Sequence, residues 1–521
     1  MNRSHSSSPA YLGLIRSAFV ATCMILHFCN ADSQNSIEGF ESGIKSDFEL
    51  QGRHKIYQSQ DSSNRVLVDW AQIYSSRLVP TIDVAKAMTV DSAGNVIVTG
   101  YTRDLSVNHN YLTVKYNSSG MQLWAVKQDD KRAVPVALAS DGQGNVFVTG
   151  SVFEGRSDFY TIKYDPYGFM EWEAIHNTDE HDFFEDHPSD VVIDSEGNVY
   201  VTGGSAAIEG GGTAYLTVKY SPDGEEIWVA RYGNDMPYNH AQALDVDSMG
   251  NVVVTGSFIN PETDFDIVTI KYDRTGSEMW IVNYDGSYPY YMDRAVDITI
   301  DNLGNIYITG DSYSQDNQFD FVSIKYNSDG DELWSRHYDA YGQEDSPSEI
   351  GLDHSGNIIV AGSSYSETSD YDFVIVKYNN AGQEQWTARY DVGGGSCDKC
   401  TGLSIDASGN VYATGKTSSA GPDSDYVTVA YNPSGDLLWV DVYDGPAADG
   451  DGAIDLAVDP EGNLIVSGTS RGPDTHYDFA TLKYGVRGQL LWESRYDGPN
   501  ESRDVPVDME IDDRGHVFVT L

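Results

Sequence analysis

The sequence predicts an all-β chain folded as a single β-propeller of four-stranded antiparallel blades. An Asp-x-x-Gly-Asn motif recurs about every 53 residues, and all nine tryptophans fall at one place in that period. Each period holds four short segments rich in β-branched and aromatic residues, with no helical periodicity. Such repeats form either a propeller or a stacked array. We expect eight full repeats plus a split or partial ninth.

The repeated motif fixes the register of the copies. It begins at Asp91, Asp141, Asp194, Asp247, Asp301, Asp353, Asp406 and Asp459, and a ninth copy from Asp512 has His516 in place of Asn. The tryptophans are Trp70, Trp124, Trp172, Trp228, Trp280, Trp334, Trp386, Trp439 and Trp492.

The copy around Asp301 shows the four predicted strands, at 295–301, 305–310, 320–326 and 332–338. The Asp side chain can accept a backbone N–H two residues on, and the Gly can adopt a positive φ, so the motif predicts a tight turn between the first two strands. A second Gly-containing turn joins the last two. Bulky residues on both faces of 320–326 favour a propeller, and we expect the Trp of each fourth strand to fill the gap between blades.

The chain ends predict closure of the ring. Residues 66–74 (VLVDWAQIY) form an isolated fourth-type strand, while 505–512 and 516–521 form first- and second-type strands. Two arrangements remain open: eight whole blades with the extra strands as caps, or nine blades of which one is incomplete. Leu521 stands where earlier copies have Gly, so a truncated C-terminus also remains open.

The N-terminus predicts export. Arg3 and Arg16 precede an apolar run of about a dozen residues, too short for a transmembrane helix. We expect a signal peptide at 1–31, a polar linker at 32–64, the propeller at 65–521, and no transmembrane segment after cleavage. A lipoprotein signal using Cys23 or Cys29 is the alternative. With either kind of export signal, we expect the protein to be secreted, periplasmic or at the cell surface.

Cleavage leaves two cysteines, Cys397 and Cys400, in a Gly-rich segment. In an exported protein we expect them to form a short-loop disulfide. A reactive dithiol and a metal site are the alternatives.

The composition limits the partners. Lys and Arg number 32 against 80 Asp and Glu, a net charge of −48. This charge excludes binding to a nucleic-acid backbone and to an anionic membrane. The share of hydrophobic residues, 40%, is enough for the chain to form a buried core. The partner is an unknown protein or carbohydrate.

The motif copies DSAGNVIVTG, DSEGNVYVTG and DNLGNIYITG resemble the bacterial beta-propeller repeat family called SBBP. The resemblance extends over about residues 66–521 and implies an exported or cell-surface propeller, without catalytic residues to transfer. A weaker likeness to quinoprotein propellers rests on GDELW at 330–334, and the motif turn and third strand depart from that pattern.

Strand alternation places the two kinds of tight turn on one face of the disc and the variable connections on the other. Asp444, Asp449 and Asp451 offer oxygen ligands for calcium there, without EF-hand spacing, and a solvated acidic loop without a bound ion is the alternative. Tyr288, Tyr290 and Tyr291 are candidate ligand contacts, or fold back over the disc. The His-rich loop at 174–189, with His176, His181 and His187, is the weaker candidate for zinc.

The sequence therefore favours a non-catalytic binding or adhesion scaffold that calcium stabilises. It contains no Gly-x-Ser-x-Gly elbow, phosphate-binding Gly-x-x-x-x-Gly-Lys loop or His-Glu-x-x-His motif. The alternative is a secreted propeller enzyme: a lyase, a glycoside hydrolase or a quinoprotein oxidoreductase.

Overall fold

The computed structural model describes residues 82–520, with gaps, and this part of the chain is built from β-strands. The gaps are 94, 104–108, 118–120, 129–130, 154–156, 177–185, 207–211, 234–235, 237, 261–263, 287–291, 315–317, 394, 419–423, 447–449, 460, 472–476, 497–507 and 512–516. Contacts divide the chain into Met1–Glu38 and Gly39–Leu521, and every described residue belongs to the second unit. The expected signal peptide, linker and strand 66–74 lie outside the described residues. A search of the described part found no helix able to cross a membrane.

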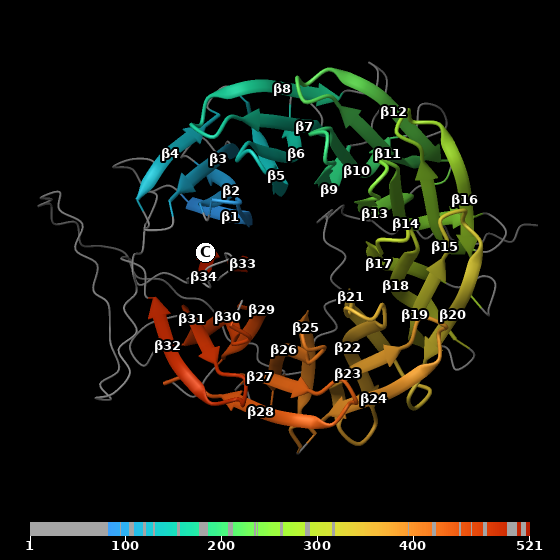
Figure 1. The fold of residues 1–521 in the computed structure, drawn as a ribbon, viewed down its shortest axis with the longest axis vertical. Coiled ribbons are helices and arrows are strands. Elements are labelled where there is room, and N and C mark those ends of the chain that lie inside the picture. The colour runs from blue at the N-terminus through green and yellow to red at the C-terminus, as the bar shows by residue number, and fades with distance from the viewer. Residues whose placement is uncertain are drawn as a thin grey trace, which may run out of the picture. The chain divides into compact units, whose positions relative to one another are not determined.

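Eight antiparallel sheets follow one another in the second unit, and each pairs its four strands in sequence order. Figure 1 shows them around a common centre, with the first strand of each sheet innermost and the fourth at the rim. We number these sheets blades 1 to 8, so that blade 1 is β1–β4 and blade 8 is β29–β32. The all-β propeller predicted from the repeats is confirmed.

The inner strands are β1 (Ile82–Val90), β5 (Ala133–Ser140), β9 (His187–Ile193), β13 (His240–Val246), β17 (Asp293–Ile300), β21 (Asp345–Leu352), β25 (Cys397–Ile405) and β29 (Gly452–Val458). The second strands are β2 (Val96–Arg103), β6 (Val146–Phe153), β10 (Val199–Ala206), β14 (Val252–Asn260), β18 (Ile306–Tyr313), β22 (Ile358–Ser366), β26 (Val411–Ser418) and β30 (Leu464–Arg471). The third strands are β3 (His109–Tyr116), β7 (Ser157–Tyr164), β11 (Thr213–Tyr220), β15 (Asp264–Tyr272), β19 (Phe319–Tyr326), β23 (Asp370–Tyr378), β27 (Ser424–Tyr431) and β31 (Tyr477–Tyr484). The outer strands are β4 (Gln122–Lys127), β8 (Met170–His176), β12 (Glu226–Gly233), β16 (Glu278–Tyr284), β20 (Glu332–Tyr338), β24 (Glu384–Tyr390), β28 (Leu437–Tyr443) and β32 (Leu490–Tyr496).

A ninth position in the ring holds a two-stranded sheet, β33 (Asp508–Ile511) and β34 (Val517–Thr520). Each inner strand contacts the inner strand of the next blade, β29 contacts β33, and β33 contacts β1. The predicted eight full repeats with a partial ninth are confirmed. The arrangement of eight whole blades with the extra strands as caps is wrong, because β33 occupies an inner-strand position between blades 8 and 1.

The repeated motif forms the predicted turn between first and second strands. Asp301 Oδ1 accepts the N–H of Leu303 at 2.8 Å and of Asn305 at 2.9 Å. The Asn305 amide donates to Asp301 Oδ2 at 2.7 Å. Gly304 adopts a φ of +79°, which explains why glycine recurs at this position. The motif Asn therefore holds the Asp side chain in place, in addition to starting the next strand.

The outer-strand tryptophans pack between blades, as predicted. Trp334 is only 6% exposed, and its indole N–H donates to the carbonyl of Asn380 in the next blade at 3.2 Å. A Cβ on Gly382 would lie 2.6 Å from the Trp334 ring. The glycine of the second turn type therefore leaves room for the tryptophan of the preceding blade.

Half-buried carboxylates on the inner strands link neighbouring blades through the backbone. Asp297 Oδ2 accepts the N–H of Ile350 at 3.3 Å, and Glu349 Oε2 accepts that of Leu403 at 2.8 Å. Asp455 Oδ2 accepts the N–H of Met509 in β33 at 3.2 Å. The ninth position is thus attached in the same way as the full blades, and these carboxylates have a structural role.

Glu349 predicts a pH dependence of stability. Burial raises its pKa from about 4.5 to about 7. The folded chain then binds more protons than the unfolded chain between these values, so stability falls as the pH rises through this range. We expect Glu349→Gln, which keeps an acceptor for Leu403, to raise the free energy of unfolding at pH 8 by on the order of 2 kcal/mol and to change it little at pH 4. Urea unfolding at both pH values measures this effect. An equal difference at the two values would contradict it.

Candidate metal centre

The strand order divides the connections between two faces of the ring. Because consecutive strands run antiparallel, the first-to-second and third-to-fourth turns share one face. We call this the turn face. The connections from second to third strand and from each outer strand to the next inner strand share the other, which we call the loop face. Binding residues are usually found on variable loops held by a rigid scaffold.

Three aspartates meet at four successive blade junctions on the loop face. One comes from a third strand, one directly follows the outer strand of the same blade, and one lies at or beside the start of the next inner strand. In each group a ligand atom from every residue lies within 4.8 Å of the others. The groups, which we call the junction triads, are Asp266, Asp285 and Asp293; Asp320, Asp339 and Asp345; Asp372, Asp391 and Asp398; and Asp425, Asp444 and Asp451.

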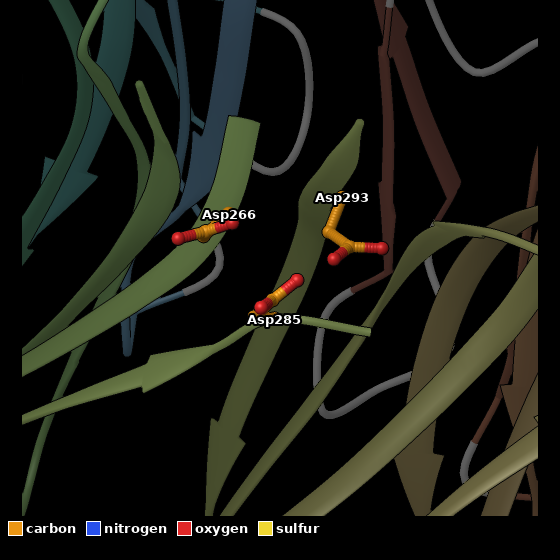
Figure 2. A group of neighbouring side chains, drawn as sticks. All are labelled: Asp266, Asp285 and Asp293. Carbon is orange, nitrogen blue, oxygen red and sulfur yellow. The ribbon is translucent and has the colours of Figure 1, made fainter. Parts of the chain in front are cut away.

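Figure 2 shows the first triad, whose side chains come from three separate elements. Asp266 lies on β15, Asp285 directly follows β16, and Asp293 is the first residue of β17. Asp266 and Asp293 are 0% and 2% exposed, whereas Asp285 is exposed. The triad therefore reaches from the interior of blade 4 to the surface and includes a residue of blade 5.

Backbone and side-chain donors hold the buried carboxylates in position. Asp293 Oδ2 accepts the N–H of Gly286 at 2.7 Å, and Asp398 Oδ2 accepts that of Val392 at 2.8 Å. In the third triad Arg389 pairs with Asp372 Oδ2 at 2.5 Å. The connection that closes each junction thus donates to the aspartate of the next blade.

The triads concentrate negative charge out of water. Burial raises the pKa of Asp293 to about 6 and that of Asp345 to about 7. The pKa values of Asp372 and Asp398 also rise, chiefly through burial. Three carboxylates in one place favour a cation, and hard oxygen ligands of this kind suit calcium.

Junctions earlier in the chain depart from the pattern. Between blades 3 and 4 the corresponding residues are Ala214, Gly233 and Asn239, and Gly233 packs directly against Ala214. Asn239 Oδ1 accepts the N–H of Ile259 at 2.7 Å. Between blades 1 and 2 the aspartate at the start of the inner strand is replaced by Ala133. The junction between blades 3 and 4 thus provides a neutral comparison with the aspartate-rich junctions.

The structure groups some of the residues predicted for calcium and leaves others undescribed. Asp444 and Asp451 lie together, and Asp425 joins them. Asp449 falls outside the described residues, as do Tyr288, Tyr290 and Tyr291. The calcium and tyrosine assignments therefore remain predictions.

The predicted disulfide between Cys397 and Cys400 is wrong. Cys400 is a free, buried thiol. Both residues belong to β25, where three residues of extended chain place their Cα atoms roughly 10 Å apart, beyond the reach of a disulfide. Burial raises the pKa of the Cys400 thiol to about 12, which also argues against a reactive dithiol.

The histidines predicted as the weaker zinc candidate lie apart in the elements that are described. His176 ends β8 and pairs with Glu226 Oε2 at 2.9 Å, while His187 begins β9. His181 falls outside the described residues. The metal-ligand groups found among described residues consist of the junction triads alone.

The third-strand aspartates were missed by sequence reasoning. Asp266, Asp320, Asp372 and Asp425 each precede the final tyrosine of their strand by six residues. Aligning the copies for aspartate as well as for the turn motif would have revealed this register.

Comparisons with known proteins agree with the architecture. Residues 287–317 match the family model described as SBBP, beta-propeller repeat. This match agrees with the resemblance drawn from the repeated motif. An uncharacterized WD repeat-containing protein, L264, of Acanthamoeba polyphaga mimivirus is 23% identical in an alignment of 241 residues, with coverage of 40% of this chain and 15% of that protein.

Solved structures similar to this chain include a eukaryotic initiation factor and the WD40 domain of SCAP from fission yeast. The initiation factor is 9% identical to this chain, and the match covers 81% of this chain and 89% of the initiation factor with a TM-score of 0.46. The WD40 domain is 10% identical to this chain, and the match covers 73% of this chain and 94% of the WD40 domain with a TM-score of 0.37. At these values neither structure informs the ligand or the activity of this chain.

Proposed function

We propose that this chain is an exported, non-catalytic propeller scaffold that binds a protein or carbohydrate outside the cell or at its surface, and that calcium stabilises it. The positively charged, apolar N-terminal segment supports export. The net charge of −48 supports solubility and an affinity for cations.

The observation that carries the binding role is the exposure of aromatic rings on the loop face. Tyr238 and Tyr341, in connections between an outer strand and the next inner strand, are 57% and 62% exposed. Arg389 lies over the Tyr341 ring, 4.7 Å from its centroid. Exposed tyrosines supply flat, amphipathic contact surfaces for sugars and peptides.

Replacing both tyrosines tests the binding role. We expect the wild-type chain to bind members of a panel of immobilised oligosaccharides and extracellular proteins, and Tyr238→Ala with Tyr341→Ala to weaken that binding at least about tenfold, as for loss of an aromatic anchor. Tyr167→Ala is the matched control, because Tyr167 is 77% exposed on the turn face. Equal loss in the control, or unchanged binding in the double variant, would reject the loop face as the binding surface.

The calcium part of the proposal has its own test. A ligand that binds only the folded chain raises its stability by mass action. We expect millimolar CaCl2 to raise the midpoint of thermal unfolding by several degrees over the same protein in EGTA, with MgCl2 giving a smaller shift. Identical midpoints in CaCl2 and EGTA would remove calcium from the proposal.

A further inference from the structure

We propose that each of the four junction triads binds one calcium ion that joins two neighbouring blades at the base of the loop face. This inference gives a location to the calcium of the proposed function and rests on that part of it. Each triad combines two aspartates of one blade with one of the next. A bound ion would therefore act as a cross-link between sheets that share no backbone hydrogen-bond ladder.

Buried carboxylate oxygens without hydrogen-bond partners support the binding of an ion at the junction triads. The Oδ1 atoms of Asp345, Asp372 and Asp398 make no hydrogen bond among the described residues, although these side chains are 1%, 1% and 0% exposed. A buried carboxylate oxygen without a donor is costly and requires an explanation. An ion in the second triad would satisfy the oxygen of Asp345, and an ion in the third triad would satisfy those of Asp372 and Asp398.

A hydroxyl group accompanies the buried aspartate of the inner strand. Asp293 pairs with Ser312, Asp345 with Ser364, and Asp398 with Thr417 on the adjoining second strand. The hydroxyl oxygens of Ser312 and Thr417 are buried and also lack a hydrogen-bond partner among the described residues. These oxygens extend the donor set beyond the three carboxylates.

The junction between blades 1 and 2 lacks the inner-strand aspartate and the hydroxyl together. There Ala133 replaces the inner-strand aspartate, and it pairs with Val152 rather than with Ser or Thr. Both side chains are fully buried, at 0% exposure. Aspartate and hydroxyl are thus present together or absent together, which a shared ligand explains and general surface acidity does not.

The donor chemistry favours calcium over other ions. Carboxylate and hydroxyl oxygens are hard ligands, and calcium accepts 6–8 of them in flexible geometry. Two oxygens on opposite sides of one calcium ion lie about 4.8 Å apart, since Ca–O distances are about 2.4 Å. The triad atoms fall within this limit. Backbone carbonyls of the connection and water would complete the coordination.

Terbium luminescence on the full-length, exported chain tests the location. A tyrosine directly precedes the second aspartate of every triad, at Tyr284, Tyr338, Tyr390 and Tyr443. Bound Tb³⁺ would therefore be excited through a neighbouring ring. We expect EGTA-stripped protein to show saturable luminescence that Ca²⁺ displaces, with about one ion bound per junction triad, four in the described junctions.

Two single substitutions assign the ions to the triads. We expect Asp293→Asn and Asp345→Asn each to lose about one bound ion and to reduce the calcium-induced rise in unfolding midpoint. Circular dichroism without metal checks the fold of each variant, and the two triads give independent readouts. Asp329→Asn is the matched control, because Asp329 is exposed on the turn face.

The outcomes separate the location from the proposed function. If both variants bind as many ions as the wild type, or lose no more than Asp329→Asn, the junction assignment is overturned. Calcium stabilisation that survives in a variant combining Asp293→Asn, Asp345→Asn, Asp398→Asn and Asp451→Asn would leave the proposed function standing and reject the sites. Absence of any Ca²⁺-displaceable Tb³⁺ signal would reject both.

Discussion

We expect Trp334→Ala to lower the free energy of unfolding by about 3–5 kcal/mol, the range for truncating a buried aromatic residue. Trp334 fills the space between blades 5 and 6, where its ring lies 6.0 Å from that of Tyr378 and covers Gly382. Truncation would leave a cavity at this junction and remove the hydrogen bond to Asn380. Urea unfolding followed by far-UV circular dichroism measures the loss.

The control for this variant is the adjacent Leu333→Ala. Leu333 belongs to the same strand but is 50% exposed, so we expect a change within about 0.5 kcal/mol. Equal losses in the two variants would contradict the packing role of the tryptophan and would indicate a general sensitivity of the outer strand.

Asp353→Ala is expected to lower the free energy of unfolding by about 3–5 kcal/mol, because it leaves a buried charge without its partner. Lys377 is 3% exposed, and its Nζ lies 2.9 Å from Asp353 Oδ2. Burial alone would raise the pKa of Asp353, but hydrogen bonds from Asn357 and Lys377 outweigh it and keep that pKa below its usual range. The variant also removes the acceptor for the N–H groups of Ser355 and Asn357.

A second substitution separates the charge from the turn. We expect Lys377→Met to restore part of the stability lost in Asp353→Ala, since the double variant has no unpaired buried charge. A double variant less stable than Asp353→Ala would contradict this explanation. Thermal or urea unfolding of the two single variants and the double variant completes the cycle.

The turns and blades could be predicted because their causes are local. The Asp-x-x-Gly-Asn sequence contains its own acceptor and its own residue of positive φ, as Asp301 and Gly304 show. The recurrence of tryptophan in each fourth strand likewise predicted that its side chain fills the gap between neighbouring blades. The residues that Trp334 contacts, Gly382 and Asn380, lie about one repeat away in the sequence and could be identified only from the structure.

The junction triads could be predicted only in part because their members come from three strands in two blades. Asp444 and Asp451 lie in one connection and were selected together with Asp449. Asp425 lies in a buried strand whose alternating pattern gave no reason to select it. The contact among the three depends on the packing of blade against blade.

The cysteine pair shows why close spacing in the sequence was misleading. A Cys-x-x-Cys segment in a Gly-rich stretch suggested a loop, but β25 begins at Cys397 itself. Once these residues are extended, the two sulfur atoms cannot meet. The closure of the ring was also undecided from sequence, because the hydrogen bond from Met509 to Asp455 links segments 54 residues apart.

Anomalous scattering from crystals of the Tb³⁺-loaded protein would test the calcium assignment most directly. The account predicts one strong peak between the carboxylates of each junction triad, at the positions that Ca²⁺ competes for, and none beside Ala214 and Gly233. Peaks scattered over the acidic surface, with the four junctions empty, would contradict it.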